Sequence, residues 1–251
     1  MQNYSKIAVL CALAVSLAAP VFGGKVVVFT DEWWTSDTGL GFEGATNFNN
    51  FTDNLVSAFG GAGNYLIYSN NSFLTGPGAT NFASRLAADG AMVTQSVSAS
   101  QSLTGFKGVF LAGPITGGAP NATALINYVN AGGNVFLEGG TAAFGDAMSE
   151  AAAWAQFLGA FGMSFSNSFD VANDCVNHPV TSANSLFAGV SSLYLCGGQQ
   201  TFSNVIATTP GANGPLNIAS LATTSGGVPE PGTLSMLLIG AALLAVRKIH
   251  R

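Results

Sequence analysis

The sequence has very few charged side chains. Asp, Glu, Lys and Arg make up 8% of its 251 residues, whereas an average soluble protein has roughly 25%. Basic residues are the scarcer of the two kinds of charged residue. Residues 24–227 contain three of them and eleven acidic residues, which gives a net charge of −8. Such a body has no basic patch to neutralise phosphates, which argues against nucleic acid as a partner. Small polar residues and 32 glycines replace the charge, as is typical of secreted bacterial surface proteins.

Histidine is also scarce. Residues 24–227 contain one histidine, His178, in the segment NHPV, where the proline indicates a structural turn. A serine or cysteine nucleophile needs a base within hydrogen-bond reach, and a lone histidine in a turn gives little support for one. A metal site would need more ligands at close spacing. We therefore expect no metal and no cofactor.

The N-terminus, MQNYSKIAVLCALAVSLAAPVFG, has the pattern of a secretory signal peptide. Lys6 precedes an apolar run over residues 7–19, and the small residue Gly23 marks the expected cleavage site. Export would involve the Sec translocon and signal peptidase. A retained membrane anchor is the alternative, but the run is too short to span a bilayer comfortably. Residues 1–23 are thus predicted to be removed.

Two cysteines remain after removal of the signal peptide, Cys175 and Cys196. In an oxidising compartment two thiols tend to join. The bond would close a loop of about 20 residues, worth about 3 kcal/mol in the chain-entropy account. We predict a Cys175–Cys196 disulfide.

Short apolar runs alternate with helix-like stretches over residues 24–215. Residues 25–29 and 134–140 are typical of buried strands, and the spacing of four apolar residues predicts a helix over 47–59. The alternation predicts one α/β domain, with a mostly parallel sheet and helices on both faces. The small polar residues of 216–227 predict a linker.

Acidic and aromatic residues follow the predicted strands. Asp31, Glu32 and Trp33 come directly after the first strand, and Glu138 closes a later one. These positions fall at the carboxyl edge of a parallel sheet, where α/β proteins bind ligands. Paired carboxylates there could act in acid–base chemistry or hold calcium, and Trp33 could stack on a sugar ring. The simpler interpretation is an acidic, solvated loop whose tryptophans cap the core.

Two functions from different classes remain open on these residues. The first is a noncatalytic surface or extracellular-matrix protein that binds through the loops at the sheet edge, with polysaccharide as a possible partner. The alternative is an extracytoplasmic, carboxylate-dependent hydrolase that acts on glycans.

Three segments resemble the glutamine-amidotransferase-like domains: FKGVFLAGPITGG, ALINYVNAGGNVFLEGG and HPVTSANSLFAGVSSL. The resemblance covers residues 25–193 and implies a flavodoxin-like sheet. Catalytic members of that superfamily carry a cysteine at the turn after the GG-led strand. Here the turn reads LEGGTAAFG, with Glu138, Gly139 and Gly140 at the turn and Thr141 just past it. The resemblance therefore implies the fold without the amidotransferase chemistry, and no catalytic residue is expected.

The C-terminus, VPEPGTLSMLLIGAALLAVRKIHR, has three parts. The motif Val228, Pro229, Glu230 and Pro231 comes first. Residues 233–246 are uncharged, and residues 247–251 are basic through Arg247, Lys248 and Arg251. A helix over the uncharged part would rise about 21 Å, less than the ~30 Å hydrocarbon core. We expect a single short transmembrane helix there.

Residues 228–251 closely resemble the PEP-CTERM sorting signal. The resemblance implies recognition by an exosortase-type membrane transpeptidase and a transient stay in the inner membrane. Transfer to the cell surface or the exterior would follow, in bacteria that make exopolysaccharide. A permanent C-terminal anchor is the alternative.

Overall fold

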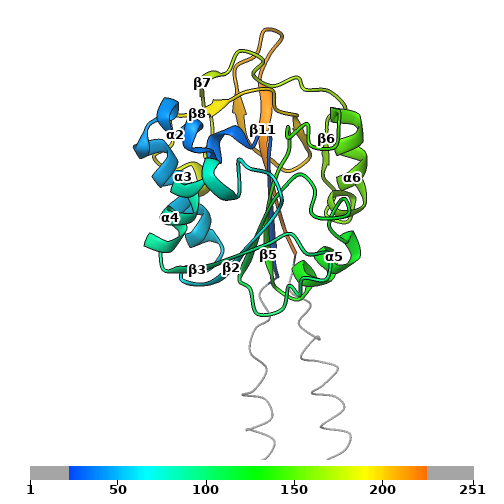
Figure 1. The fold of residues 1–251 in the computed structure, drawn as a ribbon. Helices are drawn as coiled ribbons and strands as arrows, with labels where there is room; N and C mark the ends of the chain where they lie inside the picture. The colour runs from blue at the N-terminus through cyan, green and yellow to red at the C-terminus, as the bar shows by residue number, and fades with distance from the viewer. Residues whose placement is uncertain (1–22, 225–251) are drawn as a thin grey trace, which may run out of the picture.

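The computed structural model describes residues 23–224, which form a three-layered α/β domain (Figure 1). Its central seven-stranded sheet has the order β10-β11-β1-β5-β4-β2-β3. Neighbours within the run from β1 to β3 are all parallel. These five strands are β1 (Lys25–Phe29), β5 (Asn134–Glu138), β4 (Gly108–Ala112), β2 (Gly63–Tyr68) and β3 (Ala91–Ser96). The prediction of a mostly parallel sheet is confirmed.

Helices cover both faces of this sheet, as predicted (Figure 1). One face carries α2 (Asp37–Glu43), α3 (Ala45–Ala58) and α4 (Thr80–Ala88), and the other carries α5 (Ala122–Asn130) and α6 (Ala147–Gly159). Successive side chains of a strand point to opposite faces. Val27 and Phe29 accordingly belong to the core under α3 and α4, whereas Val26 and Val28 belong to the core under α5 and α6.

Local sequence signals account for where several helices begin. The side chain of Asn121 accepts a hydrogen bond from the amide of Ala124 at the start of α5. Asp146 does the same for Ser149 in α6. Each such cap satisfies an amide that the helix leaves unpaired, and its removal typically costs about 1 kcal/mol.

The order of the parallel strands differs from the flavodoxin-like order that we expected. A flavodoxin-like sheet has the order 2-1-3-4-5. Here β1 lies next to β5 at the other end of the parallel run. With strands numbered along the chain, the spatial order of the five parallel strands is 3-2-4-5-1. Strand–helix alternation predicts parallel pairing and right-handed crossovers, but it does not specify which strands become neighbours.

The prediction of a linker over residues 216–227 is wrong for its first eight residues. Leu216–Thr223 forms β11, the longest strand of the sheet, which lies between β1 and β10 (Val205–Thr209) and is antiparallel to both. Ile218, Ala219 and Ser220 are buried. The segment can be a strand despite its small and polar residues, because β1 and β10 pair with its backbone on both sides. Its composition resembles that of a linker.

The region after α6 adds short elements above the carboxyl edge of the sheet. Its strands β7 (Val176–Pro179) and β8 (Ser192–Leu195) pair antiparallel, as do β6 (Ser164–Phe165) and β9 (Thr201–Phe202). The predicted disulfide between Cys175 and Cys196 is present, directly before β7 and directly after β8. The 3-10 helix η3 (Ser185–Phe187) lies between β7 and β8 in the chain, whereas the 3-10 helices η1 (Trp33–Thr35) and η2 (Gly76–Gly78) occur earlier, after β1 and after β2.

Both ends of the described chain lie at the amino edge of the parallel strands (Figure 1). Lys25 is opposite Thr223 in the β1–β11 register, and the Thr224 amide donates to the Gly24 carbonyl at 3.0 Å. No helix within residues 23–224 is long and apolar enough to cross a membrane. The predicted signal peptide, apart from Gly23, and the predicted transmembrane helix over 233–246 lie outside the described residues.

Candidate functional site

The acidic residues singled out in the sequence lie together at the carboxyl edge of the sheet. Asp31 and Glu32 follow β1, and Glu138 is the last residue of the neighbouring strand β5, where it pairs in register with Phe29. All three are buried: Asp31 and Glu138 have no exposed surface, and Glu32 retains 2%. The expectation of a solvated acidic loop is therefore wrong for these carboxyl groups.

A fourth carboxyl group joins them, and the sequence did not indicate it. Glu150 lies in the first turn of α6, has no exposed surface, and interacts electrostatically with Asp31 and Glu32. We call Asp31, Glu32, Glu138 and Glu150 the carboxyl cluster. Because α6 follows β5, its N-terminal turn lies at the same edge as the ends of the strands. That rule of βα units is the one signal that could have pointed to Glu150.

Burial and mutual repulsion hold protons on this cluster. Burial raises the pKa of Asp31 to about 7 and that of Glu150 to about 7. Burial, followed by the charge of Asp31, raises the pKa of both Glu32 and Glu138 well above the usual range. A buried carboxyl group without a nearby cation favours its neutral form, because the charged form is poorly solvated there.

Two of the four groups are well supplied with donors. Asp31 accepts from the Cys196 amide and, at 3.0 Å, from the Trp33 amide. Glu150 accepts from the Thr141 amide at 3.0 Å and from the Thr141 hydroxyl at 2.7 Å. In contrast, Oε2 of Glu32 and Oε1 of Glu138 have no hydrogen-bond partner. An unpaired buried polar atom is costly, so these two oxygens need an explanation.

No basic side chain of residues 23–224 pairs with the carboxyl cluster. Arg85 instead forms ion pairs with Asp53 and Asp89. The Lys25 and Lys107 ammonium groups donate to backbone carbonyls at the amino edge, namely those of residues 58, 60 and 62. The negative charge that the cluster would carry on ionisation is thus uncompensated by the described part of the chain.

His178 takes no part in this cluster. It lies in β7 rather than in the turn that its proline suggested, and its Nε2 is 2.8 Å from Asp174.

A pocket of about 430 Å³ opens at this edge, and we call it the carboxyl-edge pocket. Trp33 and Phe73 form an aromatic wall, with their ring centroids 4.3 Å apart. Glu32 lines the pocket, whereas the other three members of the cluster do not. The complete lining is Glu32, Trp33, Phe73, Gly140, Thr141, Ala142, Phe169, Asn173, Cys196 and Gly197.

The turn after β5 shapes one side of this pocket. Gly140 has a φ of 70°, and a Cβ added there would lie 2.7 Å from the Thr30 carbonyl oxygen. Ala142, which also lines the pocket, has a φ of 50° without being glycine. A non-glycine residue in this backbone conformation is strained and persists only where the surrounding structure fixes it. Such residues are found preferentially at functional sites.

The two neighbouring tryptophans have different surroundings. Trp34 is fully buried against Phe51, at a centroid distance of 4.6 Å, and belongs to the core. Trp33 is half-buried and faces the pocket. The expectation that the tryptophans cap the core therefore holds for Trp34, while Trp33 lies where a ligand could reach it.

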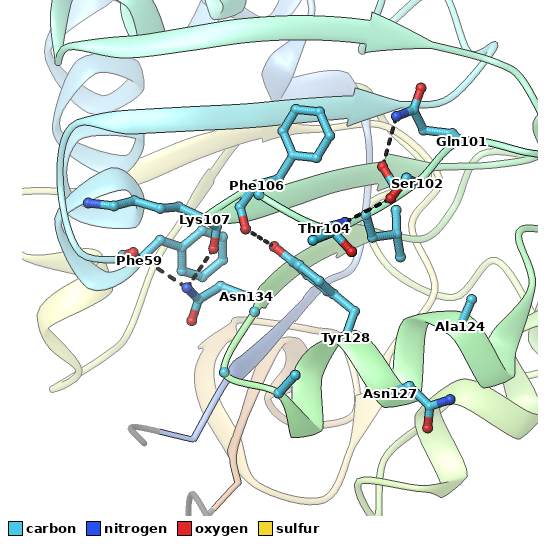
Figure 2. A pocket seen from close by; sticks show the side chains of 15 residues that line it. Phe59, Gln101, Ser102, Thr104, Phe106, Lys107, Ala124, Asn127, Tyr128 and Asn134 are labelled. Atoms are coloured by element: carbon cyan, nitrogen blue, oxygen red, sulfur yellow. Dashed lines mark hydrogen bonds between the residues drawn. The ribbon is translucent and has the colours of Figure 1, made fainter. Parts of the chain in front are cut away.

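A second cavity, of about 670 Å³, lies at the opposite, amino edge (Figure 2). It separates α5 from the loop that precedes β4. Figure 2 shows two of its polar side chains engaged with the backbone: the Tyr128 hydroxyl donates to the Phe106 carbonyl at 3.1 Å, and the Asn134 amide donates to the Lys107 carbonyl at 2.7 Å. None of its lining residues has an unpaired buried side-chain atom. The carboxyl-edge pocket is therefore the stronger candidate site.

Within residues 23–224, no group of three or more His, Cys, Asp or Glu side chains is arranged to hold a metal ion. The carboxyl cluster thus offers no geometry for the calcium site that its residue types allow.

Comparison with known proteins finds one match, at the C-terminus. Residues 227–251 match the PEP-CTERM protein-sorting motif. The motif implies sorting by an exosortase and export to the cell envelope or surface. The motif residues Val228–Pro231 and the basic residues Arg247, Lys248 and Arg251 lie in the matched segment, outside the described residues.

No curated protein and no solved structure matches the chain. The resemblance of the body to the glutamine-amidotransferase-like domains is therefore unsupported by these comparisons.

Proposed function

We propose that the chain is an exported envelope protein whose α/β domain binds polysaccharide in the carboxyl-edge pocket and does not catalyse a reaction. Signal peptidase would remove residues 1–23 after Sec-dependent export, and exosortase would act at the motif over residues 228–231. The domain between them would be delivered to the cell surface or the exterior. In this proposal it extends over residues 24–224, because β11 is part of the sheet.

The observation that carries the proposal is the wall formed by Trp33 and Phe73 beside Glu32. A sugar ring presents apolar C–H faces that pack on aromatic rings, and hydroxyl groups that need acceptors. Oε2 of Glu32 is an acceptor without a partner. An aromatic wall thus lies beside a residue whose buried acceptor lacks a partner, and these are the two kinds of group that a sugar requires.

A glycan hydrolase based on carboxylates is the second candidate. Its support is the pKa of about 7 for Asp31 and for Glu150, a value suited to a general acid. However, glycosidases generally place two carboxyl groups on either side of the scissile bond. Only Glu32 of the four lines the pocket. Binding without turnover therefore agrees better with the geometry.

The proposal is tested by titrating the protein with a panel of soluble polysaccharides while following tryptophan fluorescence. Trp33 is the half-buried tryptophan, so a ligand in the pocket should change its emission. The Trp33→Ala variant should lose about tenfold or more in affinity, equivalent to about 1.4 kcal/mol. The matched control is Phe42→Ala, since Phe42 is 60% exposed, stacks on Tyr194 and lies outside the pocket. Failure of every polysaccharide to bind would refute the binding role, and release of new reducing ends would favour the hydrolase.

A further inference from the structure

We infer that the carboxyl-edge pocket selects a sugar that carries a primary ammonium group, such as the hexosamine unit of an incompletely N-acetylated polysaccharide. The inference rests on the proposed polysaccharide binding and adds the charge and the functional group of the ligand.

The first argument is charge. Glu32, Asp31, Glu138 and Glu150 are close enough to influence one another, and no lysine, arginine or histidine of residues 23–224 pairs with any of them. A cation that entered the pocket would be the first positive charge near this cluster. An opposite charge within ~4–6 Å favours the ionised form of a carboxyl group, so binding a cation and ionising Glu32 would reinforce one another.

The second argument is the unsatisfied oxygen. Glu32 is 98% buried, as its exposed fraction of 2% implies, lines the pocket, and leaves Oε2 without a donor. An ammonium group has three donors and no acceptor. It could donate to Glu32 and still reach the Thr141 hydroxyl and the Asn173 side-chain oxygen, which line the same pocket. A hydroxyl group could satisfy Glu32 too, but it brings no charge.

The third argument is the aromatic wall. A cation within about 6 Å of an indole centroid is attracted by the electrons of the ring, most strongly for tryptophan. Trp33 presents such a ring directly next to Glu32 in the chain, and Phe73 packs against it at an interplanar angle of 37°. A carboxyl group beside an aromatic wall suits an organic cation, whose apolar carbon skeleton also contacts the rings. It does not suit a bare metal ion.

Other ligand charges agree less well with this site. A uronic acid would bring a second carboxylate beside Glu32, so it would disfavour ionisation of the cluster and supply no counter-charge. A neutral sugar can stack on Trp33 but leaves the cluster without a counter-charge. The pocket therefore discriminates by the sign of charge on the ligand.

The experiment uses the full exported chain in detergent and compares oligosaccharides of equal length by isothermal titration calorimetry. The ligands are a glucosamine oligomer, its fully N-acetylated form and a galacturonate oligomer, with spermidine as an ammonium compound that lacks a sugar. N-acetylation removes the positive charge and leaves the ring unchanged. We expect the glucosamine oligomer to bind at least about tenfold more tightly than the N-acetylated form, and the galacturonate oligomer to bind most weakly.

The variant Glu32→Gln should abolish this preference while retaining the affinity for the N-acetylated oligomer. Glu43→Gln is the matched control, because Glu43 is also buried with an unpaired oxygen but lies outside the pocket. The comparison among ligands needs no variant, so it remains decisive if Glu32→Gln fails to fold.

Equal affinity for the charged and the N-acetylated oligomers would overturn the inference and leave polysaccharide binding intact. Spermidine binding as tightly as the glucosamine oligomer would overturn the assignment to a sugar. Absence of binding by every oligomer would instead refute the proposed function itself.

Discussion

The backbone amide of Cys196 donates a hydrogen bond to the buried carboxyl group of Asp31. Cys196 is also one end of the disulfide to Cys175, and it lines the carboxyl-edge pocket. The disulfide therefore restrains the segment that satisfies one member of the carboxyl cluster and forms part of the pocket wall. The proposed ligand binding would therefore be coupled to stability at this point.

Removal of the disulfide should affect both properties. The bond joins residues 21 positions apart, and for a loop of this size the Cys175→Ser/Cys196→Ser variant should lose about 3 kcal/mol of unfolding free energy. Ligand affinity should fall as well, because the amide of residue 196 is no longer held against Asp31. Urea unfolding and ligand titration measure the two effects, and treating the wild type with a reductant provides an independent control. Unchanged ligand affinity in a folded variant would separate the disulfide from the pocket.

The pH dependence of stability follows from the buried acids. Burial raises the pKa of Asp31 and Glu150 to about 7 and that of Glu43 to about 8. The folded state therefore binds these protons more tightly than the unfolded state. The contribution of these buried acids to the free energy of unfolding is fully present below the unfolded-state pKa values, near 4. It is lost as the pH rises through the folded-state values of about 7 to 8. The melting temperature should accordingly decrease as the pH is raised from 4 to 8.

The variant Glu43→Gln isolates one part of this effect. An amide cannot ionise, and its oxygen can still accept the hydrogen bond that Glu43 receives from the Tyr194 amide. Relative to the wild type, the variant should gain stability at pH 8 compared with pH 5. Parallel curves of melting temperature against pH for the two proteins would show that Glu43 is ionised to the same extent in the folded and unfolded states.

Truncation tests the assignment of β11 to the domain. A chain of residues 24–215 lacks β11, so β1 and β10 lose their shared neighbour and the core loses the buried Ile218 and Ala219. We expect this chain to be unfolded or aggregated, and a chain of residues 24–224 to unfold cooperatively. Circular dichroism and size-exclusion chromatography distinguish these states. A cooperative transition in the shorter chain would restore the linker interpretation of residues 216–223.

A pair of glycine substitutions tests the crowding beside the pocket. Gly140 and Gly162 have nearly the same φ, 70° and 69°, but an added Cβ meets backbone atoms only at Gly140. In both alanine variants the new residue must adopt a left-handed backbone conformation, which costs about 1–2 kcal/mol of unfolding free energy. Gly140→Ala should lose about 1–3 kcal/mol more, because the turn must shift to accommodate the methyl group. Equal losses in the two variants, measured by chemical unfolding, would mean that the turn is free to move.

The sequence by itself determined the features that are carried by contiguous residues. The sorting motif at the C-terminus is one, because its proline–acid–proline group, apolar run and basic end follow one another directly. The parallel strands and their covering helices are another, since the period of the apolar residues depends on local geometry. The position of Asp31, Glu32 and Glu138 at one edge follows from strand direction alone.

Only the tertiary structure decided which distant segments meet. Trp33 gains its partner Phe73 across 40 positions, and the Cys196 amide reaches Asp31 across 165. The strand order and the inclusion of β11 are of the same kind, because backbone pairing between strands depends little on which side chains they carry. Burial of the carboxyl groups also emerged only there: an acidic side chain loses its solvation when surrounding elements cover it, and nothing in its own sequence neighbourhood requires that.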